Sequence, residues 1–155
     1  MAKKISDEVC LANYAKLCDL FNRVIPDAER FTVVYGCGVD MGMMGLMLIR
    51  STAYSYSSYA IGFDPNATEI VVLQVDRELE HYGEPYYLKK SDIVKAKIGR
   101  FSKEIRIRAS SLPQGFVTFT VQAVLNIDPD QLAVAVRQEK ESKQFLNFFT
   151  NQYMK

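Results

Sequence analysis

The sequence predicts an α+β protein that is mainly β, with an antiparallel sheet structure between two helices. Apolar and β-branched residues alternate with polar ones from Thr32 to Leu125, as in half-buried strands. Turn-forming Pro, Gly and Asn separate these runs, and helical periodicity occurs only near the two ends. We expect a single domain with a helical segment over 1–26, strands over 31–137 and a helix over 139–153.

The first helix is predicted over Asp7–Val24. Ser6 is a typical N-cap residue, and Asp7 and Glu8 place acids in the first turn. Pro26 disfavours helix at the preceding residue and ends the element. Apolar residues at alternating spacings of four and three predict the face that packs on the sheet: Cys10, Tyr14, Leu17, Phe21 and Val24.

The first strand is predicted over 31–35, which is β-branched and aromatic. The glycines of the following segment, Gly36 and Gly38 among them, indicate a bulge or tight turn. Residues 46–50 and 52–63 then have the composition of extended chain.

A turn is predicted at 64–67, where Pro65 fixes φ and Asn66 tolerates the third position. Residues 69–75 are apolar at nearly every position, which is typical of a strand covered on both faces. The polar residues 76–85 indicate a loop.

Strand character continues over 86–98, with an interruption at 89–92, and a turn at 99–102 leads into an alternating strand over 103–109. A turn at 113–115 is followed by a strand predicted over 116–125. Its inward residues are expected to be Val117, Phe119, Val121, Ala123 and Leu125, with Thr118, Thr120 and Gln122 facing outward.

The chain end allows two interpretations. Asp128 and Pro129 suit the start of one long helix, but residues 137–144 are all polar, and a helix that packs on a core needs an apolar face. We favour an extended segment over 132–136 and a helix over 139–153. Its apolar face comprises Phe145, Phe148, Phe149 and either Gln152 or Tyr153.

The charge of the chain is unevenly distributed. The formal net charge is +1, yet residues 89–108 hold eight basic and two acidic residues, a local +6, and the rest of the chain carries −5. No apolar run reaches the ~18 residues that span a bilayer, and no apolar segment follows the charged start as in a secretory signal. We therefore expect a cytoplasmic location.

The hairpin over 93–109 is the candidate binding site. If the core side is formed by Val94, Ala96, Ile98, Ile105 and Ile107, the cations Lys95, Lys97, Arg106 and Arg108 share the outer face, with Arg100, Phe101 and Lys103 at the tip. Such a cluster suits an anionic membrane surface, a phosphorylated ligand or a nucleic-acid backbone, and we expect no sequence-specific nucleic-acid binding. The alternative is a solvated sheet face or an edge strand that lysines protect from pairing.

Other motifs give weaker hypotheses. An exposed strand edge or the Met-rich surface of Met41, Met43, Met44 and Met47 would serve a protein partner or a homo-oligomer. A small enzyme with Cys37 as nucleophile and His81 as base is the least favoured hypothesis, and we expect a non-enzymatic protein. The glycines do not have the G-x-G-x-x-G phosphate-loop spacing. The carboxylates Asp76, Glu78, Glu80 and Glu84 indicate a solvated loop. Cys10, Cys18 and Cys37 lack metal-ligand spacing, so no metal or cofactor is expected.

Several stretches together resemble a bacterial pleckstrin-homology-like (PH-like) domain, and more closely a family of small, functionally uncharacterised bacterial proteins of that type. They are Tyr59-Ala-Ile-Gly-Phe63 before Glu69-Ile-Val-Val72, the turn at Asp64-Pro65, Gly83-Glu84-Pro85 before Asp92-Ile-Val-Lys-Ala-Lys97, Tyr87-Leu88 ahead of Asp92-Ile93, and the helix from Phe145 to Tyr153. The likeness covers roughly 31–153. It implies a bent, partly open barrel of antiparallel strands that the C-terminal helix caps at one end.

The resemblance also suggests a ligand class. Members of the wider family that bind phosphoinositides carry a lysine, a gap and a basic-x-arginine triplet across a hairpin. Lys97, eight further residues and then Arg106-Ile107-Arg108 are similar to that pattern. The resemblance thus implies peripheral binding at the inner membrane face.

Overall fold

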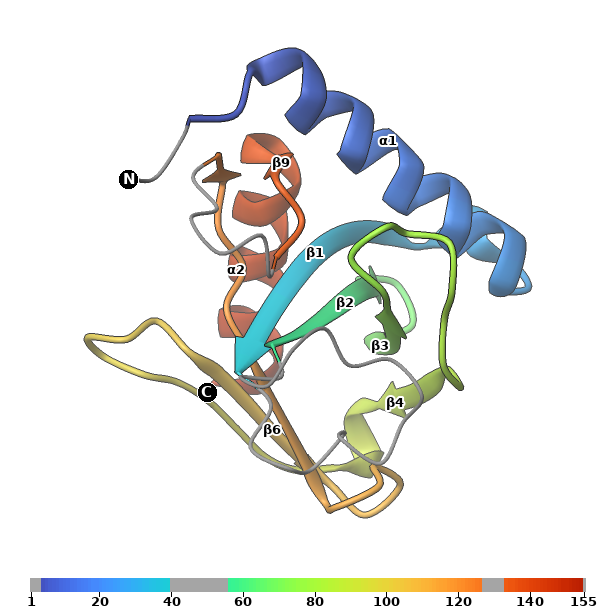
Figure 1. Ribbon diagram of the computed structural model, residues 1–155. Helices are drawn as coiled ribbons and strands as arrows, with labels where there is room; N and C mark the ends of the chain where they lie inside the picture. Colours follow the sequence, from blue (N-terminus) through green and yellow to red (C-terminus); the bar gives the residue numbers. More distant parts are fainter. Residues whose placement is uncertain (1–3, 40–55, 127–132, 155) are drawn as a thin grey trace.

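Two antiparallel sheets packed face to face form the body of the protein (Figure 1). The computed structural model describes residues 4–39, 56–126 and 133–154. One helix covers the outer face of the first sheet, and the other lies against the end where the two sheets meet. The predicted α+β class is confirmed. Within the described ranges the strands form separate sheets of four, three and two strands and no closed barrel.

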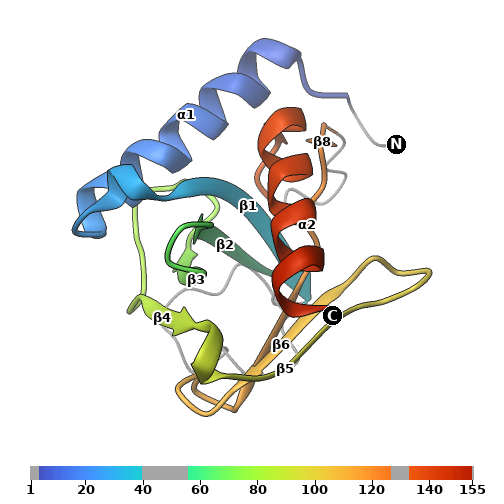
Figure 2. The same cartoon turned by 180° about the vertical axis from the view of Figure 1, so that it is seen from behind.

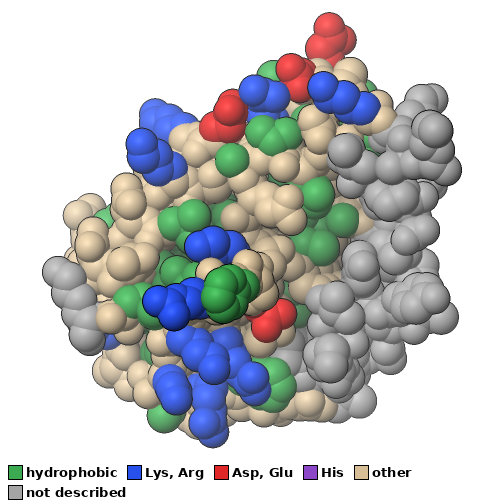
Figure 3. Space-filling model, turned by 90° about the vertical axis from the view of Figure 1, so that its left-hand side faces the viewer, with side chains coloured by type: hydrophobic (Ala, Val, Ile, Leu, Met, Phe, Trp, Pro, Cys, Tyr) green, Lys and Arg blue, Asp and Glu red, His purple; other side chains and the backbone are tan. Residues whose placement is uncertain are grey.

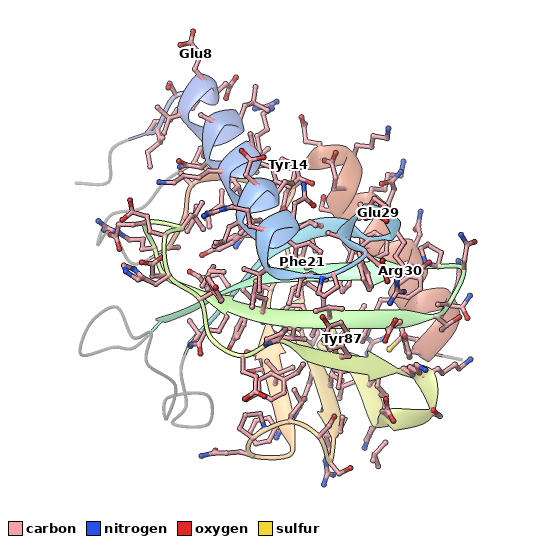
Figure 4. The ribbon with its side chains drawn as sticks, turned by 90° about the vertical axis from the view of Figure 1, so that its right-hand side faces the viewer. Glu8, Tyr14, Phe21, Glu29, Arg30 and Tyr87 are labelled. Carbon is pink, nitrogen blue, oxygen red and sulfur yellow. The ribbon has the colours of Figure 1, made fainter. Side chains whose placement is uncertain are left out.

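Helix α1 spans Asp7–Val24, the bounds that the sequence predicts. The Ser6 side chain accepts a hydrogen bond from the backbone N–H of Val9 and caps the helix. Its buried face consists of Cys10, Leu17, Leu20 and Phe21. Phe21 points from α1 toward the sheet (Figure 4) and lies directly over Gly62, where a side chain would collide with its ring. The small residue therefore lets the helix approach the sheet closely.

The first sheet contains four strands in sequential order. After a short 3₁₀ turn, η1 (Ala28–Arg30), come β1 (Thr32–Val39), β2 (Tyr56–Asp64), β3 (Glu69–Val75) and β4 (Tyr86–Lys89). Every residue of β3 is buried, which confirms the predicted strand with two covered faces. Val71, Leu73 and Val75 face α1, whereas Ile70 and Val72 face the second sheet.

The connections in this sheet are largely as predicted. Asp64 accepts hydrogen bonds from the N–H groups of Asn66 (2.9 Å) and Ala67 (3.3 Å), which fixes the turn between β2 and β3. The predicted loop at 76–85 is confirmed, with one bridge between Val75 and Tyr82. The extended segments predicted at 46–50 and 52–55, and the Met-rich surface at 41–47, lie outside the described residues.

The second sheet contains β5 (Ile93–Ile98), β6 (Ile105–Ala109) and β7 (Phe116–Phe119) in that order. The predicted interruption before β5 is the 3₁₀ turn η3 (Lys90–Asp92), which Asp92 stabilises by accepting the N–H of Lys89 at 2.9 Å. Four residues of β6 and β7 are fully buried against the first sheet: Ile105, Ile107, Val117 and Phe119.

The prediction of a single strand over 116–125 is wrong, because β7 ends at Phe119 and the chain bends there. A short β8 (Val124–Leu125) pairs instead with β9 (Val136–Arg137). Ala123 is therefore exposed rather than inward, and Thr118 is buried rather than outward. The bend brings Thr120 into a bridge with Cys37 on the free edge of β1.

The same crossing corrects the role predicted for Gly36 and Gly38, whereas the later glycines of that segment lie outside the described residues. Gly36 and Gly38 lie within β1 and form neither a bulge nor a turn. A Cβ atom on Gly38 would collide with the carbonyl oxygen of Thr118. Gly38 is glycine because the backbones of β1 and β7 touch there, which joins the two sheets. A Cβ atom on Gly36 would instead press against the ring of Phe119 in β7.

One side chain pairs with the free edge of β1. Gln138 accepts the N–H of Tyr35 at 2.7 Å and donates to the carbonyl oxygen of the same residue at 3.1 Å. Its amide also donates to the carbonyl oxygen of Gln122 at 2.8 Å. The glutamine amide thus replaces a neighbouring strand at this point, and buried backbone groups keep their partners.

Helix α2 spans Glu139–Tyr153, again as predicted. Its buried aromatic residues are Phe145, Phe148 and Phe149, and Tyr153 packs beside the last two. The Phe145 ring lies 5.3 Å from that of Phe63 in β2 and 6.3 Å from that of Phe119 in β7, centroid to centroid. The helix therefore contacts both sheets, and it ends near β5 (Figure 2).

Candidate functional site

The hairpin of β5 and β6 places four cations on one face. In its register Lys95 lies opposite Arg108, and Lys97 lies opposite Arg106. Ile105 and Ile107 point the other way and are fully buried. The period of two in the sequence predicts this arrangement for β6, and the structure confirms it.

The prediction that Val94 faces the core is wrong. The register shifts between Ile93 and Lys95, which is a β-bulge, and the Val94 side chain is 75% exposed. A bulge sets two residues of one strand against one of the other, so the alternation of side chains breaks there. Ala96 and Ile98, beyond the bulge, are half-buried and pack on the core.

The four cations line a shallow, partly open depression of about 110 Å³. Figure 3 shows Lys and Arg side chains gathered over the end of this hairpin. A pocket for a whole drug-sized molecule is usually roughly 300–1,000 Å³. The depression therefore suits one small charged group, such as a phosphate, better than a complete nucleotide.

One of these cations is held in place by an aromatic ring. The Arg106 guanidinium carbon lies 4.4 Å from the centroid of the Phe116 ring in the next strand. Such a contact contributes about 0.5–1 kcal/mol at an exposed site. It fixes the guanidinium beside the depression without neutralising its charge.

The charges on this face are not balanced by acids among the described residues. Among the described residues, none of Lys95, Lys97, Arg106 and Arg108 forms an ion pair with a carboxylate. Like charges directly opposite each other on neighbouring strands destabilise a sheet. The face is therefore one on which an external anion would relieve repulsion.

The tip of the hairpin carries the other three predicted residues. Arg100, Phe101 and Lys103 are all exposed, and Phe101 is exposed to 92%. The structure therefore places all seven predicted site residues on one hairpin, four along its outer face and three at its tip.

Cys37 and His81 are not brought together. Cys37 pairs with Ser58, Ser58 with Val75, and Val75 with Tyr82, so two strands separate Cys37 from the loop that carries His81. At ~4.8 Å per strand the two backbones are about 14 Å apart. A nucleophile and its base need to lie about 2.6–3.2 Å apart.

His81 is paired with Asp76 instead. Its Nδ1 lies 2.7 Å from a carboxylate oxygen of Asp76, whose other oxygen accepts the N–H groups of Glu80 (2.7 Å) and His81 (3.0 Å). This hydrogen bond raises the pKa of His81. Burial by itself would raise the pKa of Asp76, but the bonds from His81 and Glu80 lower it. Three of the four loop carboxylates are solvated as predicted, whereas Asp76 stabilises the loop.

An ion-pair cluster around Arg30 was not predicted from the sequence. Arg30 donates to Asp64 at 2.8 Å and to Glu69 at 2.7 Å, and both carboxylates are buried. Asp64 and Glu69 lie directly opposite each other across β2 and β3. Two acids that flank one hairpin turn require a cation between them, and that spacing was the available signal.

Known proteins offer no assignment for this site. A scan against protein-family models, a search of curated proteins and a search of solved structures each found no match. Within the described ranges, no three or more His, Cys, Asp or Glu side chains are grouped as metal ligands. None of the helices described is both long and apolar enough to cross a membrane.

Proposed function

We propose that this protein is a non-enzymatic interaction module of the PH-like type that binds anionic membrane surfaces through the β5–β6 hairpin. The observation that carries the proposal is the face formed by Lys95, Lys97, Arg106 and Arg108. These four cations lie opposite one another across the hairpin, and none forms an ion pair with an acid among the described residues. Lipid phosphates and carboxylates supply the missing negative charge.

The fold supports the PH-like part of this proposal. Seven consecutive antiparallel strands form sheets of four and three, and α2 packs its phenylalanines against both sheets. This agrees with the bent, partly open barrel and closing helix that the resemblance implies. The basic motif differs in position, because it lies on β5 and β6 rather than on the first two strands. The proposed surface is therefore argued from its own charges.

The expected affinity is modest and depends on salt. Each Lys or Arg near an anionic bilayer contributes about 1 kcal/mol, and this falls off within a Debye length. The four cations of the depression together give roughly 4 kcal/mol, which corresponds to a millimolar-range dissociation constant. The three tip residues add to this value, so the protein would bind reversibly.

Co-sedimentation with vesicles tests the proposal. We expect binding to vesicles that contain phosphatidylserine, no binding to neutral phosphatidylcholine vesicles, and loss of binding at higher salt. The triple variant Lys97→Glu, Arg106→Glu, Arg108→Glu should abolish it. A matched control makes the same charge change at three exposed residues outside the hairpin: Lys16→Glu, Arg23→Glu, Lys140→Glu.

The control should retain most of the binding. If both triple variants lose binding equally, net charge and not the hairpin is responsible. If the unmodified protein fails to bind anionic vesicles even at low salt, where screening is weakest, the membrane proposal is wrong.

Self-association or protein binding at a strand edge is the second candidate. β5 is the last strand of its sheet, and no described strand pairs with its outer side. Val94 is exposed on that strand. Lysines and a bulge are features that discourage edge pairing, so this candidate ranks second. Light scattering over a range of protein concentrations would detect a dimer, and Val94→Lys should dissociate it if β5 forms the contact.

A further inference from the structure

Phe101 at the hairpin tip is the most exposed of the large apolar side chains that the structure describes, at 92%. Single exposed apolar residues are common on protein surfaces and need no explanation by themselves. The position of this one is unusual, because it lies in the turn between β5 and β6, and this hairpin extends away from the body of the protein (Figure 1). The side chain is therefore accessible to a flat surface such as a bilayer.

The loop that presents Phe101 is held by its own hydrogen bonds. The N–H of Gly99 donates to the carbonyl oxygen of Glu104 at 2.7 Å, and the N–H of Lys103 donates to that of Gly99 at 3.1 Å. Ser102 accepts the N–H of Glu104 at 3.2 Å. The aromatic ring is thus offered from a structured turn, which lowers the entropy lost when it binds.

Cations surround this ring on the hairpin. Arg100 and Lys103 flank it in the loop. Lys97 and Arg106 lie opposite each other, next to the last pair of the hairpin, Ile98 and Ile105. Phenylalanine is among the apolar residues that interfacial segments bury at the boundary between lipid headgroups and acyl chains. Lysine and arginine side chains can extend from that depth to the phosphates. The tip combines both kinds of side chain within one turn.

We infer that Phe101 inserts into the headgroup–acyl boundary of an anionic bilayer while Arg100 and Lys103 contact lipid phosphates. This inference rests on the proposed membrane binding and adds an orientation to it, with the hairpin standing on its tip. At about 3.4 Å per residue, the Lys97–Arg106 pair lies roughly 10–14 Å from Phe101, so only its long side chains extend toward a headgroup layer roughly 5–8 Å thick. The Lys95–Arg108 pair, two residues further along β5, lies outside that layer and acts on the anionic surface only through the longer-range attraction that salt screens.

Tryptophan fluorescence gives a direct test, because the chain contains no tryptophan. Phe101→Trp creates a single probe at the tip. Val94→Trp creates a matched probe at the other end of β5, a position that is also highly exposed, roughly 20 Å away at the usual rise per residue. Both variants are titrated with phosphatidylserine-containing vesicles, with and without brominated acyl chains.

We expect the emission of Phe101→Trp to shift to shorter wavelength and to be quenched by brominated lipid, while Val94→Trp does neither. Phe101→Ala should bind vesicles about 10- to 100-fold more weakly, the effect of removing one fully buried aromatic side chain. Its thermal stability should be unchanged, because the side chain contacts almost nothing in the protein.

Two results would overturn the inference and leave membrane binding intact. In one, Phe101→Trp co-sediments with vesicles but its emission neither shifts nor is quenched, so that the hairpin adsorbs by charge alone. In the other, Val94→Trp is quenched and Phe101→Trp is not, so that the hairpin lies on its side. If neither variant nor the unmodified protein co-sediments, the proposed function fails as well.

Discussion

Two arginines of this protein have the same aromatic contact and opposite electrostatic surroundings. The guanidinium of Arg30 lies 4.2 Å from the centroid of Phe31, and that of Arg106 lies 4.4 Å from the centroid of Phe116. Arg30 also binds two buried carboxylates, Asp64 and Glu69. Arg106 faces Lys97 across the hairpin. Figure 4 shows Arg30 just past α1, at one end of the first sheet.

This difference separates a structural cation from an available one. A ring holds either guanidinium in position, but among the described residues only Arg30 is paired with carboxylates. The Arg30 cluster gains nothing from an added anion. The hairpin face, where like charges oppose each other, does gain. If this interpretation is correct, changes at Arg30 should act on stability and changes at Arg106 on binding.

The largest effect is expected from Arg30→Ala. The substitution leaves two buried carboxylates without their cation, and we expect a loss of about 2–3 kcal/mol in the free energy of unfolding. Arg106→Ala should cost less than about 1 kcal/mol, because only its ring contact is lost. Urea unfolding of both variants measures the difference. Equal losses would contradict the distinction.

Acid pH should reproduce part of the Arg30→Ala effect. Burial alone would raise the pKa of Asp64, but the hydrogen bonds from Arg30, Ala67 and Asn66 lower it below the usual value. A lowered folded-state pKa adds stability that is present above the unfolded-state value, ~4, and is lost as pH falls through the folded-state value.

The stability difference between the unmodified protein and Arg30→Ala should therefore shrink below pH ~4. Urea midpoints measured from pH 7 down to pH 3 provide the test. A difference that stays constant over this range would mean that Arg30 stabilises the fold by packing rather than by charge.

A smaller effect of opposite sign is expected at the hairpin. Lys97→Glu places a carboxylate opposite Arg106, and the new pair should stabilise the protein by about 0.2–1 kcal/mol. The same variant should bind anionic vesicles at least about fivefold more weakly, since the loss of one basic residue removes about 1 kcal/mol. Lys16→Glu, an exposed site on α1, is the control for both measurements. A variant that is both less stable and equally well bound would contradict our interpretation.

The smallest effect on stability is expected from the ion pair of Asp76 and His81. Its cation is paired with a carboxylate, as Arg30 is, but lies at the surface. The pKa of His81 is raised by Asp76, so the contribution is complete below the unfolded-state value of ~6.5 and disappears as pH rises through the folded-state value. An NMR titration should show the His81 pKa falling toward its ordinary value in Asp76→Asn. No change would mean that the carboxylate does not hold the ring in solution.

Local sequence patterns predict both helices with their bounds, because caps and periodicity are set within a few residues. They also predict the face of the hairpin that holds the cations. They do not predict the bulge that exposes Val94, since nothing in the local pattern marks which strand carries an extra residue. The bend after Phe119 and the close approach at Gly38 depend on contacts between β1 and β7, which lie about eighty residues apart in the sequence. Arg30 likewise pairs with acids more than thirty residues away.

The amide that pairs with β1 has a consequence for synthesis on the ribosome. The four strands of the first sheet are complete once residue 89 has emerged, but Gln138, whose side chain pairs with Tyr35, is made 103 residues after it. Until then the nascent chain exposes an open strand edge, the kind of surface that promotes misassembly between neighbouring chains. The residue that covers this edge of β1 is thus translated long after the strand itself.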